Sequence, residues 1–254
     1  MLFSEQLLFL LTFLISVCTP TYIYHRRKMV MAKSLQKFSK KRVFKVTLIN
    51  LSINVTMYIF FLILLLSILF KTSDMSRLIV MVAMSSLVVI GLSFYGSGIY
   101  VASITHKAFT LPELKNLDSY KTQHIATHIF HGPISHVLIF SGYIIVFLLL
   151  SVLDIFTGRG SAGVTQYLWG SGAILGLFFG LAQIFNGSIP YQFVTSLVTF
   201  LILLMYAQKT HHSIYEYSVA TYFVGFSISF LLVSLIYYFY RGRHKENIWD
   251  LSGH

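Results

Sequence analysis

The 254-residue sequence has very little charge for its length. Only 11% of its residues are Asp, Glu, Lys or Arg, whereas soluble globular chains have about 25%. So few charged side chains cannot cover a water-facing surface, which excludes a soluble enzyme, a disordered tail and a soluble nucleic-acid-binding module. The only cysteine is Cys18, so a disulfide scaffold is excluded as well.

Acidic residues are especially scarce. There are 8 acidic residues against 19 Lys and Arg, which gives a net charge of +11. A strongly basic chain can bind nucleic acid, but here the basic residues crowd the ends of apolar runs. That distribution is typical of a membrane protein, and hydrophobic residues make up 56% of the chain.

Long apolar runs dominate the rest of the sequence. A helix that crosses about 30 Å of hydrocarbon needs about 20 mostly apolar residues. None of the runs shows the alternation of a membrane β-barrel, so we expect an all-α integral membrane protein. It forms a single polytopic domain, 1–254, with seven transmembrane helices at about 7–24, 46–70, 78–102, 136–156, 167–186, 190–207 and 217–240.

The positions of Lys and Arg predict the orientation. If the loop at 25–45 is cytoplasmic, 15 of the 19 basic residues lie on the inner side and 4 on the outer side. This predicts an outside N-terminus and a cytoplasmic C-terminus. No basic residue precedes the first apolar run, so we interpret that run as a retained anchor and not as a signal peptide.

The long inner connection has the pattern of a surface helix. Thr110-Leu-Pro-Glu113 is typical of a capping box with proline in the first turn, and Gly132-Pro133 is typical of a helix stop. We therefore expect one amphipathic helix at about 111–131 on the inner membrane surface.

Four histidines of this region give the clearest chemical signal. His124, His128 and His131 fall within about 60° on one face of a helix, and His136 follows the Gly-Pro break. Imidazoles at i, i+4 and i+7 can converge on one ion, and neutral imidazole binds Zn, Cu, Fe, Ni or haem iron. We name these four residues as candidate ligands of a transition metal or of a single b-type haem.

The same four histidines are also compatible with roles that need no metal. Histidine is tolerated at a membrane interface because its ring is amphipathic, and a histidine cluster can also sense protons or contact a substrate. No carboxylate or cysteine lies among the four to complete a mixed ligand set.

A second polar group is predicted on the outer side. It consists of His211, His212 and Glu216, with Asp154 and Arg159 on the same side. It is either a second polar site or a solvated loop. No ionisable residue lies deep within a predicted span, which argues against a proton-coupled pump or a voltage sensor.

Gly172, Gly176 and Gly180 recur at every fourth residue of one predicted span. Such a small-residue ridge is typical of close helix packing in membranes, although it could also line a ligand cavity.

These patterns support two hypotheses for function. The first is a multi-pass membrane protein with a cytoplasmic-side histidine site, which serves membrane redox chemistry or the assembly of a metalloenzyme. The alternative is a non-catalytic receptor, an uncoupled carrier or a structural subunit of a membrane complex. The sequence does not decide whether the chain is an enzyme. Expected partners are the lipid bilayer, anionic headgroups at the 25–45 loop and other membrane subunits, with no nucleic acid.

Overall fold

The computed structural model describes residues 59, 61–70, 74–104, 134–160, 165–185 and 189–243. Within these residues the fold is helical throughout, and no strand occurs in them. Residues 61–69 are helical. They are followed by α3 (Met75–Ile104), α5 (Ser135–Phe156), α6 (Thr165–Phe185), α7 (Ile189–Thr210), the 3-10 turn η4 (Ile214–Glu216) and α8 (Ser218–Arg243).

The helices match five of the predicted spans closely. Four helical segments are long and apolar enough to cross a membrane: Ser135–Phe156, Tyr167–Ile184, Ile189–Thr210 and Ser218–Arg241. Helix α3 contains a shorter apolar segment, Met75–Gly91. This indicates a membrane protein.

Several parts of the predicted architecture fall on undescribed residues. The span at 7–24, most of the span at 46–70 and the surface helix at 111–131 lie outside the described residues. The count of seven helices and the orientation therefore stay predictions.

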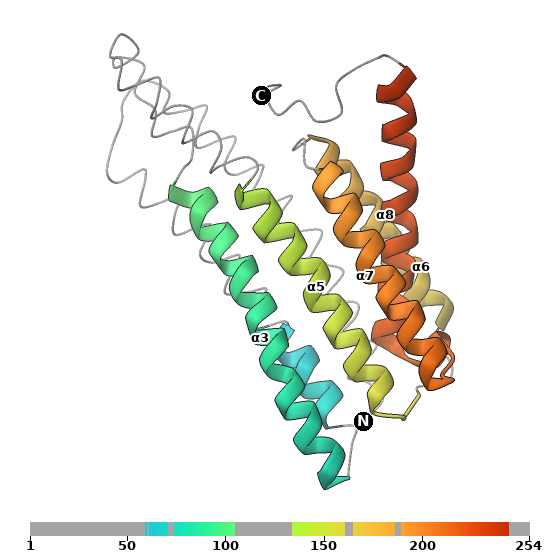
Figure 1. Ribbon diagram of the computed structural model, residues 1–254. Helices are drawn as coiled ribbons and strands as arrows, with labels where there is room; N and C mark the ends of the chain where they lie inside the picture. The colour runs from blue at the N-terminus through green and yellow to red at the C-terminus, as the bar shows by residue number, and fades with distance from the viewer. Residues whose placement is uncertain are drawn as a thin grey trace.

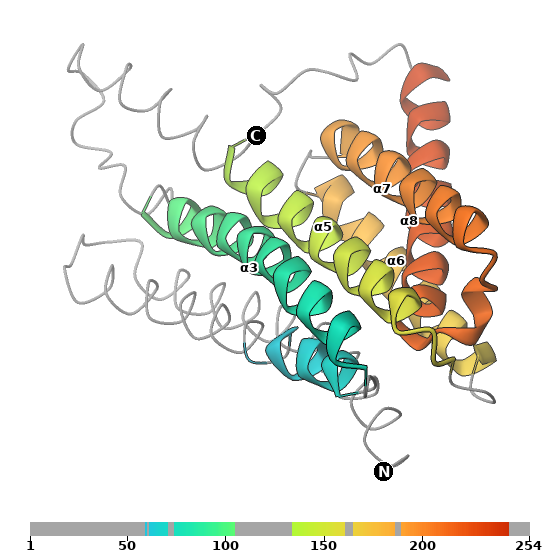
Figure 2. The same cartoon turned by 60° about the horizontal axis from the view of Figure 1, so that its bottom comes forward.

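Successive helices run antiparallel, and α5 lies between the others (Figure 1). Helices α3 and α5 lie side by side in both views (Figures 1 and 2) and are in extensive contact. Helices α6 and α7 are antiparallel (Figure 1), but they have few contacts with each other. Instead α6 packs along α8, while α7 contacts both α5 and α8.

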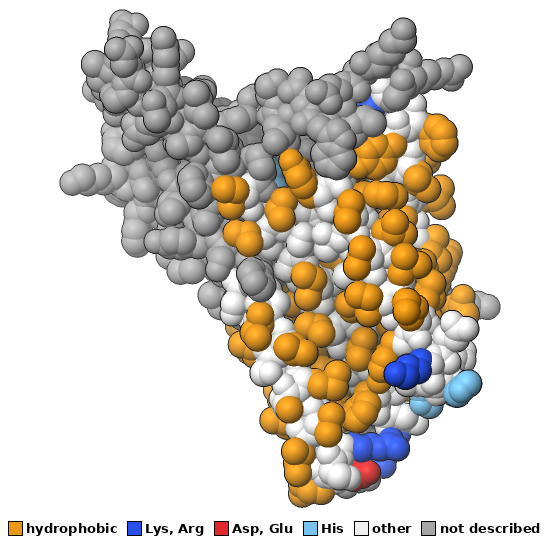
Figure 3. All heavy atoms as spheres, in the orientation of Figure 1, with side chains coloured by type: hydrophobic (Ala, Val, Ile, Leu, Met, Phe, Trp, Pro, Cys, Tyr) orange, Lys and Arg blue, Asp and Glu red, His pale blue; other side chains and the backbone are white. Residues whose placement is uncertain are grey.

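The burial pattern is that of helices in lipid. Every described side chain of α5 is buried or half-buried, whereas many large apolar side chains on α3, α6, α7 and α8 are exposed. Figure 3 shows these apolar side chains along the flank of the bundle, with charged and histidine side chains at its lower end and further basic and histidine atoms near its upper end. An apolar flank is what a hydrocarbon environment requires.

Aromatic rings fill the space where α5, α6 and α8 meet. Phe147 of α5 stacks on Tyr222 of α8 at a centroid distance of 5.7 Å. Phe179 of α6 lies edge-on to Phe226 at 5.2 Å and stacks on Tyr143 at 5.7 Å. Ring pairs at these separations add about 0.5–1.5 kcal/mol each beyond the area they bury, so they fix how the three helices pack.

Glycine brings α6 and α8 into direct backbone contact. A Cβ atom at Gly172 would overlap the carbonyl oxygen of Tyr222, and one at Gly176 would overlap that of Phe226. On the other helix, a Cβ at Gly225 would overlap the carbonyl oxygen of Trp169. The predicted glycine ridge is therefore a helix-packing surface and not the wall of a cavity.

Candidate functional site

Only one of the four candidate metal ligands lies in the described part of the chain. His136 is in the first turn of α5 and is half-buried. Its imidazole lies 5.8 Å from the ring of Phe140, measured between centroids. His124, His128 and His131 are outside the described residues, so the convergence of the four imidazoles stays a prediction.

A side chain from α7 holds the backbone of His136. The Nε2 of Gln192 donates a hydrogen bond to the His136 carbonyl oxygen at 3.3 Å, and Gln192 is fully buried. This contact fixes the first turn of α5 against α7 and thereby the position from which the imidazole projects.

The same contact begins a polar seam between α5 and α7. The Ser141 hydroxyl lies 3.4 Å from Gln192 Oε1 and 3.2 Å from the Thr195 hydroxyl. Thr195 also donates to the carbonyl oxygen of Tyr191. We define the polar seam as His136, Ser141, Gln192 and Thr195. The sequence did not single out Ser141, Gln192 or Thr195, because isolated hydroxyl and amide residues in apolar runs carry little signal.

At the opposite end of the bundle, Asp154 joins α5 to α8. Its side chain is 0% exposed, and its Oδ2 accepts a hydrogen bond from the Val219 backbone N–H at 2.9 Å. Val219 is in the first turn of α8, where backbone N–H groups lack intrahelical acceptors and the helix dipole favours a negative charge. A buried ionisable group in a membrane span is usually functional, but this carboxylate has a clear structural role as a cap.

The turn after α5 is held by a cation from α3. The Nη1 of Arg77 donates to the carbonyl oxygen of Thr157 at 3.2 Å. The Nε of the same Arg77 lies 3.6 Å from Asp74 Oδ2, and hydrogen bonds from Ser76 lower the pKa of the Asp74 carboxyl. Gly158 has a φ of +65°, so glycine suits this turn.

The His-His pair forms the end of α7. His211 has a φ of +55°, its N–H bonds to the Gln208 carbonyl, and the His212 N–H bonds to the Ala207 carbonyl. These two hydrogen bonds define a Schellman motif, in which glycine usually occupies the position of His211. Histidine is among the residues that tolerate this conformation, so His211 has a structural role in ending the helix.

His212 contacts a buried phenol. Its Nδ1 lies 3.1 Å from the hydroxyl oxygen of Tyr217, and Tyr217 is almost fully buried. Burial, together with the carboxylates of Glu216 and Asp154, raises the pKa of Tyr217 above 10.0. Because the unfolded chain would ionise first, this residue makes the fold lose stability as the pH rises above 10.0.

Most of the predicted outer polar group is accessible, as the interpretation as a solvated loop expects: His211, Glu216 and Arg159 are exposed, His212 is half-buried, and Asp154 is buried. Asp154 and His211 are parts of helix ends, and His212 is bonded to Tyr217. Among the residues that the structure describes, no three His, Cys, Asp or Glu side chains form a group that could hold a metal ion.

No protein-family model matches this chain, and no curated protein or solved structure is significantly similar to it. The class of the protein therefore rests on the fold alone. Several long apolar helices, an apolar flank and close glycine packing define a helical membrane protein.

Proposed function

We propose that the chain is a multi-pass membrane protein that binds a transition metal or a single haem through His136, together with His124, His128 and His131. The observation that carries the proposal is the position of His136. It lies at the start of α5, and Gln192 hydrogen-bonds to its backbone at 3.3 Å. A ligand held in this way meets the requirement that a metal site be supported by a rigid element.

The bound group would serve membrane redox chemistry or the assembly of a metalloenzyme. His124, His128 and His131 belong to the segment that leads into α5, so they join His136 through a short length of chain. In this account the basic loop at 25–45 docks on anionic headgroups or on another membrane subunit.

Elemental analysis and an absorption spectrum of detergent-purified protein test this function. We expect one metal per chain or a Soret band in the wild type, lost in His128→Ala/His131→Ala and weakened in His136→Ala. His211→Asn is the matched control, because His211 lies at the opposite end and asparagine also tolerates its backbone conformation. A colourless, metal-free wild type would overturn the proposal, and so would equal loss in the control.

The second candidate function is a non-catalytic subunit of a membrane complex. The filled aromatic interior between α5, α6 and α8 favours it, because rings such as Phe147, Phe179 and Phe226 occupy the space that a substrate would need. Chemical crosslinking in native membranes followed by mass spectrometry tests it. A defined partner crosslinked in stoichiometric yield would support it, whereas a chain that works alone and needs a metal would contradict it.

A further inference from the structure

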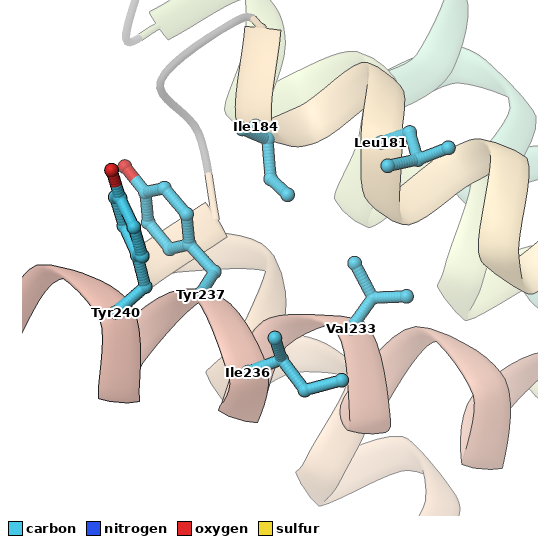
Figure 4. A pocket seen from close by; sticks show the side chains of 6 residues that line it. All are labelled: Leu181, Ile184, Val233, Ile236, Tyr237 and Tyr240. Carbon is cyan, nitrogen blue, oxygen red and sulfur yellow. The ribbon is translucent and has the colours of Figure 1, made fainter.

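An apolar groove lies between α6 and α8, near the end of the bundle where both helices end. Its volume is about 420 Å³. Figure 4 shows the six side chains that line it: Leu181, Ile184, Val233, Ile236, Tyr237 and Tyr240.

The groove exists because the backbone contact between α6 and α8 ends at Gly176, about one turn before the groove begins at Leu181. At Gly176 the two backbones touch, but at Gly180 an added Cβ would meet the side chain of Val233 and not backbone. The next residue, Leu181, has a full side chain. The two helices therefore stand further apart beyond Gly180, and their side chains leave a space between them.

The groove faces the lipid and not the interior of the protein. The exposed fraction is 42% for Leu181, 63% for Ile236 and 61% for Tyr240. It extends along α8 from Val233 to Tyr240, which is about 10 Å of helix. One leaflet of the hydrocarbon core, which an acyl chain spans, is roughly 15 Å thick. The groove is therefore long enough to hold most of one acyl chain.

The polarity of the groove changes along its length. Leu181 and Val233 form its apolar end, and at the other end the hydroxyls of Tyr237 and Tyr240 point in the same direction (Figure 4). The guanidinium carbon of Arg241 lies 5.4 Å from the centroid of the Tyr237 ring. A cation and two phenols at the mouth of an apolar groove complement an amphiphile with an anionic headgroup.

We propose that this groove binds a glycerophospholipid with an anionic headgroup. One acyl chain lies against Leu181 and Val233, and the phosphate lies near the guanidinium of Arg241, which stays positively charged at any physiological pH. The distribution of Lys and Arg predicts that α8 ends on the cytoplasmic side, where anionic lipids are concentrated. The proposal does not depend on a bound metal.

Native mass spectrometry of the full-length protein tests the proposal, with phosphatidylglycerol and phosphatidylcholine of the same chain length as the probes. The wild type should retain one phosphatidylglycerol and bind it about fivefold more tightly than phosphatidylcholine, since one basic residue near the headgroup gives an effect of that size. Arg241→Gln should remove this preference and leave phosphatidylcholine binding unchanged. Leu181→Trp, which fills the groove, should weaken the binding of both lipids.

Two variants serve as matched controls. Arg159→Gln makes the same charge change at the opposite end of the bundle, and Leu201→Trp adds the same bulk to an exposed face of α7. Both should bind lipid as the wild type does. Equal binding of the two lipids by the wild type would overturn the proposal, as would loss of preference in Arg159→Gln. A Leu181→Trp protein that changes from dimer to monomer with unaltered lipid binding would show instead that the groove is an interface between copies.

Discussion

Two helix pairs in this bundle are held together by different means. Helices α6 and α8 touch through their backbones at Gly172, Gly176 and Gly225. Helices α5 and α7 meet through the polar seam, in which Gln192 and Ser141 form side-chain hydrogen bonds across the interface. The first interface depends on the absence of side chains, and the second depends on their presence.

This difference predicts how each pair responds to mutation. Lipid provides no hydrophobic driving force between helices, so close packing and hydrogen bonds must hold them. A backbone contact leaves little room for an added side chain, because its Cβ atom would overlap the backbone of the other helix. A hydrogen bond between side chains can be lost at a cost of about 0.6 kcal/mol on average, so the α5–α7 pair should tolerate changes that the α6–α8 pair does not.

The largest expected effect comes from breaking the glycine contact. Gly176→Leu should lower the free energy of unfolding by roughly 3 kcal/mol or more, because overpacking usually costs about 1–3 kcal/mol and the obstacle here is the backbone of Phe226. Gly170→Leu is the matched control, since a Cβ there would meet nothing within 4 Å. Denaturation in mixed micelles measures both variants, and equal losses would contradict the account.

The cap between α5 and α8 should have the next largest effect. Asp154→Ala removes the acceptor for the Val219 N–H, and a hydrogen bond to a charged group contributes about 1.5–3 kcal/mol. Asp154→Asn should be milder, because its amide oxygen still accepts. Thermal unfolding compares the two variants, and wild-type stability in Asp154→Ala would show that the cap contributes nothing.

The polar seam should respond less. A double-mutant cycle with Ser141→Ala and Gln192→Leu should give a coupling free energy of about 0.6 kcal/mol, and at most about 1.7 kcal/mol. The same unfolding assay measures all four proteins of the cycle. A coupling as large as the effect of Gly176→Leu would remove the contrast between the two helix pairs.

The smallest expected effect is a gain in stability, not a loss. His211→Gly should stabilise the chain by roughly 1 kcal/mol or less, because glycine adopts a φ of +55° without the strain of a side chain. Ser213→Gly is the control, since Ser213 has a φ of −75° and should lose stability when it becomes glycine. A destabilised His211→Gly protein would point to a role for the imidazole itself.

The lengths of the helices could be predicted well from the sequence. The expected span at 136–156 is α5 at Ser135–Phe156, and the one at 217–240 is α8 at Ser218–Arg243. Helices in lipid must be apolar over a length that the bilayer sets, so their ends are visible in a single sequence. The glycine ridge also predicted a packing face. It did not predict that α8 would be its partner, because the single Gly225 has no periodic pattern.

The polar positions were harder to predict. Asp154 was grouped with the outer residues, but its role depends on contact with Val219, which is 65 residues away. The histidine hypothesis stays a prediction, with His136 as the one candidate ligand in the described residues. The bonds of Gln192 and Ser141 could not be foreseen, since they require knowing which faces of α5 and α7 meet.

Disulfide crosslinking in native membranes tests the central claim, the direct contact of α6 with α8, most directly. In a Cys18→Ser background, Gly180→Cys/Val233→Cys places two thiols where the Cβ atoms come within reach of a disulfide after a small shift. We predict rapid loss of both free thiols on mild oxidation, with the chain still monomeric, and no loss in Gly170→Cys/Val233→Cys. Thiols that stay free in the first pair, or that react only between chains, would contradict this packing.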